Sequence, residues 1–473
     1  MSNYDLNSEV KKAVKGLGFL EADKEIKGET TISNRRRRRR IPQQDENIVS
    51  VTLTRDDEGV LRWEEGLIPF SRPGRRMRRG PGAVTSGETV EQFKFEKLRQ
   101  NEIGQMLESL DRQLTPNMGQ SSGKLRRVKF NNDQVIWEDL EQPSAVNDKQ
   151  KILVFIHGTF SSNDHVIGQE IAAPTNNAGK AMLNLLANGP NKPYDEVLAF
   201  DHPTLSVSPM LNALDLSRLF ANTQAQVDVI CHSRGGLVAR WWLEVFERNA
   251  KPGKVVMVGS PLGGTSLADP TRLRSSIQFL ANISNAVGST IGFSFGNPFM
   301  TISASLFKLI SSLGSLTAKT PLIDAAIAMV PGLAAQSRVG NNFELRRLRT
   351  IHDRLPIYYA VKSNFQPKTI DVWKFWKFFV DKPLLRAANA GVDFIFGRDE
   401  KGTLEIENDL VVNTRSMTEL FGNEEDNKKF KGVLDFAKKK ASEEVHHVNY
   451  FQQAETIKFI RESLWEKDKE KAG

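Results

Sequence analysis

The stretch V-D-V-I-C-H-S-R-G-G-L-V-A-R, Val227 to Arg240, decides how this chain of 473 residues is interpreted. Its first five residues are mostly apolar, as in a strand buried on both faces. After Ser233, two glycines and an apolar run predict a helix. The chain therefore turns sharply at a serine between a strand and a helix.

Similar strands and helices alternate on both sides of this stretch, from Lys151 onward. Such alternation predicts parallel strand pairing with helical crossovers, and hence a doubly wound sheet. Ser233 then lies at the carboxyl end of a strand, where open α/β sheets place their ligands. The predicted strands are Ile152 to Ile156, Glu196 to Phe200, Val227 to Cys231, Lys254 to Val258 and Pro356 to Val361, and the predicted helices are Ala181 to Ala187, Leu211 to Ala221, Gly236 to Arg248 and Gln453 to Leu464.

A serine on a strained strand-to-helix turn exposes its Oγ and aims the next backbone N–H into an oxyanion hole. Such a nucleophile elbow needs small residues two positions to either side, and an ordinary strand-to-helix connection is the alternative. Gly235 fits, whereas Cys231 stands where glycine is usual. A buried free cysteine is usually structural, so we interpret Cys231 as core filler in preference to a second nucleophile.

Three motifs together carry a family resemblance: His157-Gly158-Thr159-Phe160, His232 to Val238, and Gly259-Ser260-Pro261, each after a predicted strand. They resemble the lipase and esterase branch of the α/β-hydrolase superfamily, and are most similar to poorly characterised bacterial lipase-like members. The resemblance covers about Lys151 to Lys467. It implies an α/β-hydrolase fold with a mostly parallel doubly wound sheet, and it leaves the first 150 residues unexplained. The residue patterns described below add a helical lid insertion and an N-terminal α+β extension to the expected fold.

In this fold the triad follows the chain order serine, acid, histidine. Three of the seven histidines follow Ser233, and His446 and His447 lie just before the last predicted helix, where the family places its base. Adjacent residues of an extended loop point in opposite directions, so only one of the two is expected to reach Ser233. The resemblance favours His447, with Asn449-Tyr450-Phe451 anchoring the loop, and leaves His446 as the alternative base.

The acid is expected after the strand Pro356 to Val361. Asn408 to Val412 resembles the acid loop of lipases, which favours Asp409 over Asp393 and Asp399. The resemblance implies an oxyanion hole formed by the N–H of Arg234 and that of Phe160, with Thr159 as the alternative. His157 is expected to shape this loop. No metal ion or cofactor is implied, since the histidines lack ligand spacing apart from the adjacent pair.

The composition is that of a globular protein, with 39% hydrophobic and 26% charged residues. A single cysteine excludes an internal disulfide. Met1 to Leu20 has no apolar core of a secretory signal, so a cytoplasmic location is expected, with peripheral membrane contact as an option.

Most of the net charge of +8 lies in residues 30–80, which contain 13 Lys and Arg and 7 Asp and Glu. The runs Arg35 to Arg40 and Arg72 to Arg79 are interpreted as solvated segments that could also attract an anionic membrane surface. No aromatic stacking platform accompanies them, so nucleic acid is not expected as a partner.

The first 147 residues are expected to divide at about residue 45. Residues 1–45 are predicted to be a disordered basic segment, and residues 46–147 a small α+β region. Within the latter we expect a hairpin at Ile48 to Trp63, a helix from Glu88 to Leu114 and a second hairpin at Leu125 to Trp137. The hydrolase domain would occupy residues 148–473.

Residues 275–337 contain only Lys308, Lys319 and Asp324 as charged groups. Repeated glycines, with Asn297 and Pro298, argue against a membrane span. We predict an apolar helical lid over Ser233 at about residues 270–345, with core packing alone as the alternative.

These features predict a serine hydrolase that cleaves acyl esters, of the lipase or esterase kind. The alternatives are a thioesterase or amidase with the same triad, a membrane-directed phospholipase acting as an effector or defence protein, and a catalytically degenerate binding module. The sequence leaves the oligomeric state open.

Overall fold

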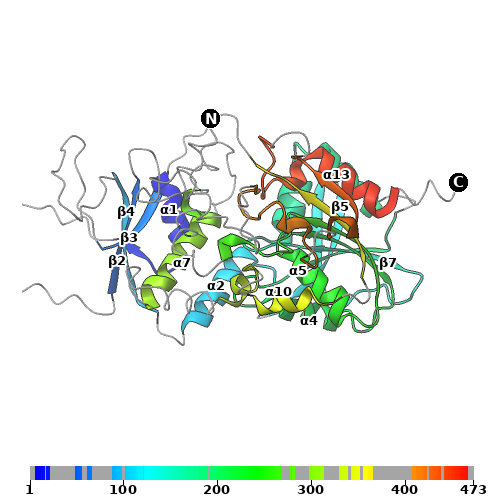
Figure 1. Ribbon diagram of the computed structural model, residues 1–473, viewed down its shortest axis with the longest axis horizontal. Helices are drawn as coiled ribbons and strands as arrows, with labels where there is room; N and C mark the ends of the chain where they lie inside the picture. The colour runs from blue at the N-terminus through cyan, green and yellow to red at the C-terminus, as the bar shows by residue number, and fades with distance from the viewer. Residues whose placement is uncertain are drawn as a thin grey trace, which may run out of the picture. The chain divides into compact units, whose positions relative to one another are not determined.

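The chain forms two compact units in the computed structural model (Figure 1). The smaller comprises Met1–Met106, Arg274–Ala326 and Lys377–Asp381, and the larger comprises Leu107–Leu273, Ile327–Trp376 and Lys382–Gly473. The structure describes residues 6–15, 17–21, 48–55, 61–66, 88–98, 102–120, 122–188, 192–268, 277, 280–282, 298–313, 330–338, 342–351, 355–365, 407–422, 426–437 and 442–466.

The larger unit is built on an eight-stranded sheet with the order β12-β11-β10-β9-β7-β8-β5-β6. Its strands pair in parallel from β12 to β8, and the β5–β6 hairpin joins β8 antiparallel. The strands are β5 (Lys124–Asn131), β6 (Gln134–Leu140), β7 (Lys151–Ile156), β8 (Glu196–Asp201), β9 (Gln226–His232), β10 (Lys251–Val258), β11 (Ile357–Lys362) and β12 (Phe430–Asp435).

The central strands are largely apolar because helices cover both of their faces. On one face, Val154 and Val229 pack in a core with residues of α4 and α5, among them Leu216. On the other face, Phe155 packs in a core with residues of α3 and α13. The predicted doubly wound sheet is thereby confirmed. Helix α2 (Ile103–Leu114) crosses the boundary between the two units. The other described helical segments of the larger unit are η2 (Asp164–Ile171), α3 (Asn177–Asn188), α4 (Pro209–Leu219), α5 (Gly235–Arg240), η3 (Trp241–Phe246), η4 (Ser266–Ala268), α9 (Pro331–Ala334), α10 (Phe343–Leu348), η8 (Ser416–Thr418), η9 (Asp426–Lys429), η10 (Tyr450–Gln452), α13 (Ala454–Arg461) and η11 (Glu462–Glu466).

The β5–β6 hairpin belongs to the eight-stranded sheet of the larger unit and not to an N-terminal region that ends at residue 147. Leu125 of β5 faces Phe200 of β8, and Leu125 and Phe130 are buried in the two cores of the larger unit. Hairpin signals are local, so the sequence identified the two strands without their partner. The compact unit therefore begins at Leu107.

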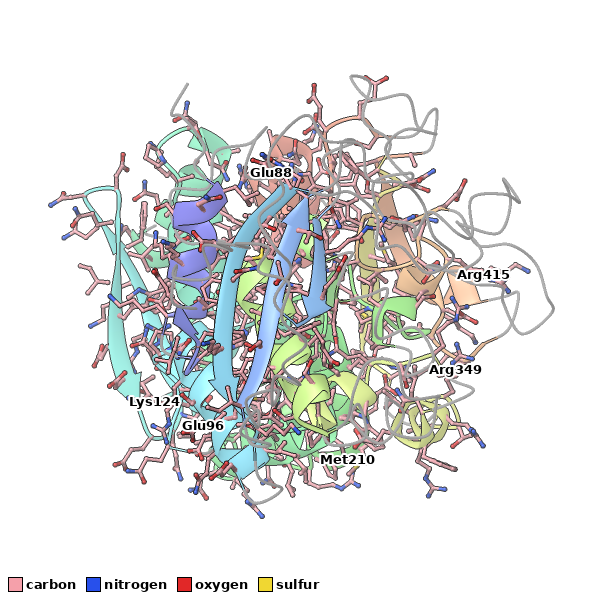
Figure 2. The ribbon with its side chains drawn as sticks, turned by 90° about the vertical axis from the view of Figure 1, so that its left-hand side faces the viewer. Glu88, Glu96, Lys124, Met210, Arg349 and Arg415 are labelled. Atoms are coloured by element: carbon pink, nitrogen blue, oxygen red, sulfur yellow. The ribbon has the colours of Figure 1, made fainter. Side chains whose placement is uncertain are left out.

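The smaller unit contains an antiparallel sheet with the order β1-β4-β2-β3. Helices α1 and α7 pack against each other, and the buried Trp63 of β3 stacks on Phe307 of α7 at 5.5 Å between ring centroids. Strand β4 runs between the labelled Glu88 and Glu96 in Figure 2. The elements are α1 (Leu6–Val14), β1 (Leu20–Glu21), β2 (Ile48–Arg55), β3 (Leu61–Glu65), β4 (Glu88–Glu96) and α7 (Pro298–Leu313).

Two predictions for the N-terminal residues are wrong. The segment Glu88 to Leu114 is not one helix, because β4 precedes α2; Val90, Phe93 and Phe95 have high strand propensity and are buried against neighbouring strands. Nor are residues 1–45 wholly unstructured, since α1 and β1 lie within them and Val10 is fully buried.

Other predictions fall partly or wholly outside the described residues. Arg35 to Arg40 and Arg72 to Arg79 lie outside them, as do Asp393 and Asp399. The predicted lid at 270–345 is described in part: α7 is in the smaller unit, whereas α9 and α10 are in the larger. A lid over Ser233 stays a prediction. None of the described helices has the length and apolarity that a bilayer crossing requires.

Candidate active site

Ser233 occupies a strained turn between β9 and α5. Its φ angle of 51° is in the left-handed region, which a residue with a Cβ adopts only at an energetic cost. The Ser233 N–H donates to Val258 O at 2.8 Å, which fixes the turn against β10. At Gly235 a Cβ would lie 2.4 Å from Ile156 O, so this close approach requires glycine. The geometry is that of the expected elbow.

Cys231, two residues before Ser233, is fully buried in the core cluster that contains Val229 and Leu237. Its Sγ lies 3.5 Å from Val256 O, and burial raises the pKa of the thiol. Since the thiolate is the reactive form, a raised pKa disfavours nucleophilic attack by Cys231. These observations support its interpretation as core filler, and they show that the turn tolerates a residue larger than glycine there.

Asp409 and His447 form a buried pair, with His447 Nδ1 and Asp409 Oδ2 2.8 Å apart. Tyr450 Oη donates to the same Oδ2 at 2.9 Å, and the N–H groups of Val411 and Val412 donate to Oδ1 at 3.1 and 2.8 Å. A carboxylate with this many donors is held in one orientation. His447 therefore carries its proton on Nδ1, which leaves the Nε2 lone pair free to accept another.

The acid and histidine loops are tied to each other and to the end of β11. The His447 N–H donates to Asp409 O at 2.9 Å. Ser363, next after β11, donates through its hydroxyl to Val445 O at 2.8 Å and accepts at its carbonyl from Thr414 Oγ1 at 2.7 Å. Burial, followed by the neighbouring Asp409 charge, raises the pKa of Tyr450 well above its usual value. Tyr450 therefore remains a neutral donor to Asp409.

His446 is buried without a hydrogen bond at either ring nitrogen among the described residues. Its ring meets Phe365 edge-on at 5.4 Å between centroids. Burial lowers the pKa of His446 from its usual value to about 4. An unpaired, neutral imidazole in an apolar setting contacts neither Asp409 nor Ser233 by a hydrogen bond, which favours His447 as the base.

His446 leads to a stability prediction. The unfolded chain takes up a proton at His446 below about pH 6.5, whereas the folded chain does so only near pH 4. Stability is thus lost as the pH falls through this window, by about 2 kcal/mol between pH 6.5 and 5. Urea unfolding of His446→Phe is expected to show a pH dependence that is weaker by this amount. Equal pH dependence in both proteins would contradict the buried, neutral state of His446.

Ser233 and His447 lie on adjoining segments. The His232 and His447 ring centroids are 4.9 Å apart, and His232 Nε2–H donates to His447 O at 2.9 Å. A Cβ at Gly259, whose φ is 59°, would lie 3.4 Å from His447 Nδ1 and 3.3 Å from Asp409 Oδ2. In the described structure Ser233 Oγ does not hydrogen-bond His447 directly. The expected contact between them stays a prediction; such contacts often tighten only when substrate binds.

The loop after β7 approaches Ser233 closely, because a Cβ at Gly158 would lie 2.7 Å from Ser233 Cβ. Phe160 has a φ of 59°, and its N–H lies 3.4 Å from Thr204 Oγ1. Thr159 donates through its hydroxyl to Gln336 Oε1 at 2.9 Å, so the C-terminal part of the predicted lid segment contacts this loop. The two alternatives for the second oxyanion donor, Phe160 and Thr159, are therefore adjacent to the elbow.

Arg234 is the expected first oxyanion donor through its backbone N–H, which has no acceptor in the described part of the chain. Its side chain is fully buried and donates from Nη2 to Val207 O. Burial lowers the pKa of Arg234 to about 10, so the guanidinium remains charged at neutral pH. The main chain and the side chain of Arg234 thus have separate environments.

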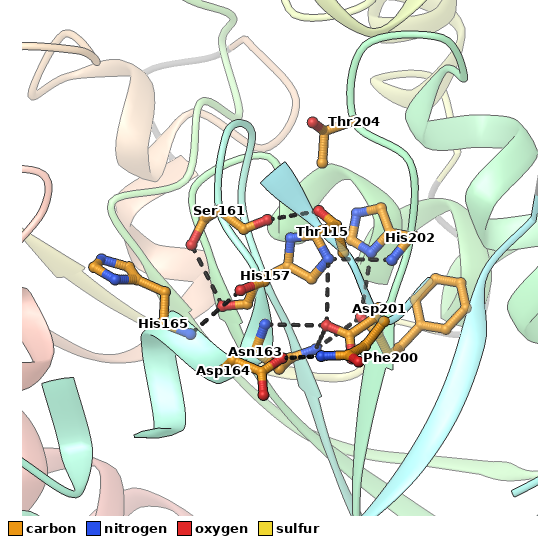
Figure 3. Close-up of polar contacts among 12 residues, drawn as sticks. Thr115, His157, Ser161, Asn163, Asp164, His165, Phe200, Asp201, His202 and Thr204 are labelled. Atoms are coloured by element: carbon orange, nitrogen blue, oxygen red, sulfur yellow. Dashed lines mark hydrogen bonds and ion pairs between the residues drawn. The ribbon is translucent and has the colours of Figure 1, made fainter. Parts of the chain in front are cut away.

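His157 contacts both its own loop and the segment after β8, and Figure 3 shows its ring beside His202. Its Nδ1 donates to Gly158 O at 2.9 Å, and its Nε2 accepts from the His202 N–H at 3.1 Å. Burial lowers its pKa, so it stays neutral. Asp201 accepts from the Asn163 N–H and side-chain amide, both at 3.0 Å, and is paired with Arg126. Asp201 was not among the residues predicted for the site. Its position directly after the predicted strand Glu196 to Phe200 indicated that it could lie at the edge of the sheet where the site was expected.

The sheet order, the strained turn at Ser233 after β9, and the Asp409–His447 pair on the loops after β11 and β12 are those of an α/β-hydrolase fold. Residues 124–465 match the family model described as "Domain of unknown function (DUF7379)". The chain belongs to this family. No curated protein matches the sequence.

Several solved structures resemble the chain. The mature lipase BlEst2 of Bacillus licheniformis is 14% identical, with 68% of this chain and 96% of that chain covered and a TM-score of 0.32. Lipase 1 of Pelosinus fermentans is 12% identical (65% and 98% covered, TM-score 0.35), and carboxylesterase CesB of Bacillus subtilis is 10% identical (77% and 99% covered, TM-score 0.30).

Proposed function

We propose that this protein is a serine hydrolase that cleaves carboxylic acyl esters, of the lipase or esterase kind, through Ser233, His447 and Asp409. The observation that carries the proposal is the buried Asp409–His447 pair, at 2.8 Å, on loops adjoining a serine held at a φ of 51°. A nucleophile, a base with a fixed tautomer and a buried carboxylate are the parts that covalent acyl transfer needs.

In the proposed mechanism, His447 Nε2 removes the Ser233 hydroxyl proton as Oγ attacks the acyl carbonyl. The tetrahedral oxyanion accepts hydrogen bonds from the N–H groups of Arg234 and Phe160. The new imidazolium is stabilised by Asp409, and its proton then passes to the departing alcohol. Water repeats the sequence on the acyl-enzyme: His447 removes its proton, the carboxylic acid leaves, and Ser233 regains a proton.

Tyr450 would keep the Asp409 carboxylate in place during this cycle by donating a hydrogen bond to it. Its hydroxyl shares Asp409 Oδ2 with His447, so Asp409 stays oriented while the charge on His447 changes. The burial of Asp409, which is fully covered, excludes water that would compete for these donors. The same groups could act on thioesters or amides, and only the substrate distinguishes these reactions.

A substrate panel tests the proposal. Wild type, Ser233→Ala and the control Ser217→Ala are assayed with p-nitrophenyl esters of increasing acyl length, phosphatidylcholine vesicles, acyl-coenzyme A thioesters and acyl anilides. We expect hydrolysis of the esters by wild type and by Ser217→Ala, because Ser217 lies on α4 and its hydroxyl donates to Phe246 O of η3. Ser233→Ala is expected to lose the activity.

Preference for thioesters or anilides over every ester would assign the alternative reaction to the same residues. Undiminished ester hydrolysis by Ser233→Ala would remove Ser233 as the nucleophile. A wild type without activity on any substrate, and with no labelling of Ser233 by a fluorophosphonate, would favour a degenerate binding module.

A further inference from the structure

A buried carboxylate on α2 organises the loop that follows β8. Asp111 is fully buried and accepts from the N–H groups of Thr204, Leu205 and Ser206 at 2.6, 2.8 and 2.8 Å. It also accepts from the hydroxyls of Thr204 at 3.1 Å and Ser206 at 2.6 Å. Five donors from three consecutive residues satisfy this charge, so the loop has one conformation around it.

The Thr204 hydroxyl extends this network to the loop beside Ser233. Its proton is directed to the Asp111 carboxylate, the stronger acceptor, which leaves the oxygen lone pairs for the Phe160 N–H at 3.4 Å. This is the hydrogen bond that the structure records for the Phe160 N–H. Asp111 thus fixes the direction in which Thr204 presents its acceptor.

The residues after α2 hold the other side of the same loop. Thr115 Oγ1 donates to Ser161 O at 2.9 Å, the contact drawn in Figure 3, and Asn117 Nδ2 donates to Asp164 Oδ2 at 2.7 Å. The loop is therefore held at Ser161 and Asp164 by the residues after α2, and at Phe160 by Thr204. Its left-handed φ of 59° persists only where surrounding contacts maintain it.

We propose that Thr204, oriented by Asp111, is a positioning residue that holds the Phe160 N–H at the oxyanion hole before the substrate arrives. The inference rests on the proposed function, because it assigns the oxyanion hole to Phe160 and Arg234. The 3.4 Å contact from Phe160 N to a neutral hydroxyl is weak, so a developing oxyanion, which is a stronger acceptor, replaces Thr204 as the acceptor of this N–H. Preorganisation of this kind acts on the transition state and not on substrate binding.

Thr204→Val and Ser206→Ala form a matched pair. Each removes one hydroxyl bonded to Asp111, but only Thr204 also contacts the Phe160 N–H. Thr204→Val is expected to lower kcat for ester hydrolysis by about tenfold to a hundredfold, less than loss of an oxyanion donor, with KM within about twofold. Thr204→Ser, which keeps the hydroxyl, is expected to retain kcat within about threefold, as is Ser206→Ala.

Melting temperatures and the rate of inactivation by a fluorophosphonate accompany the kinetics. Should Thr204→Val not fold, Thr204→Ala serves in its place, with the same expected split between kcat and KM. A kcat for either variant equal to that of Ser206→Ala, or a change confined to KM, would overturn the positioning role while Ser233 chemistry stands. Absence of esterase activity in wild type would instead count against the proposed function.

Discussion

His447→Ala is expected to lower the rate of ester hydrolysis by about a hundredfold to ten-thousandfold, the usual cost of losing a positioned general base. The His447 Nδ1–H is committed to Asp409 Oδ2 at 2.8 Å, so its Nε2 is the atom available to Ser233. Alanine removes both nitrogens and leaves the Asp409 carboxylate with Tyr450 and two backbone donors. Steady-state kinetics on a short-chain ester, near pH 8, measure the effect.

His446→Ala is the matched control, because it truncates the adjacent histidine. His446 has no hydrogen bond at its ring nitrogens and its pKa is lowered by burial to about 4, so its removal costs packing and not proton transfer. We expect this variant to retain most of the wild-type rate. The reverse order of the two variants would transfer the base role to His446.

Asp409→Asn is expected to lower kcat by about ten-thousandfold, the size of effect that the same change has in other serine triads. An amide in place of the carboxylate cannot neutralise the imidazolium, and its NH2 group favours the wrong histidine tautomer. The variant should fold, because the side chains are nearly isosteric. Kinetics with the same ester, together with a melting temperature, separate loss of catalysis from loss of folding.

Asp435→Asn on β12 is the control for this variant, since Asp435 pairs with Lys362 at 3.3 Å near the surface. It should leave kcat unchanged. If Asp409→Asn kept the wild-type rate, the acid would lie elsewhere, and Asp393 and Asp399 would be the next residues to replace.

The parts of the fold that the sequence predicted are those with a local cause. Strands β7 to β10 are largely apolar because both of their faces are buried, and the turn at Ser233 is marked by the glycines after it. Strand β4 was mistaken for a helix because its apolar residues also fit helical spacing. Strand β12 (Phe430–Asp435) was not predicted, because it is an edge strand whose residues are mostly only partly buried or exposed, and its sequence is not an apolar run.

In the candidate site, too, the residues with a local sequence motif were predicted, and those that depend on distant contacts were not. Motifs around Asp409 and His447 identified two residues that the structure brings together. The roles proposed for Asp111 and Thr204 could not be predicted from the sequence, because they depend on a contact between residues 93 positions apart. A buried aspartate on an amphipathic helix has the sequence appearance of a solvated one until its partners are known.

The central claim is that Ser233 is the nucleophile activated by His447, and covalent labelling tests it most directly. Wild type, Ser233→Ala and His447→Ala are incubated with a fluorophosphonate, and intact mass followed by peptide mapping locates the adduct. We predict one adduct per chain, on Ser233, with no adduct in Ser233→Ala and a labelling rate at least a hundredfold lower in His447→Ala, since phosphonylation needs the same base. An adduct on another residue, or equal labelling of Ser233→Ala, would contradict the account.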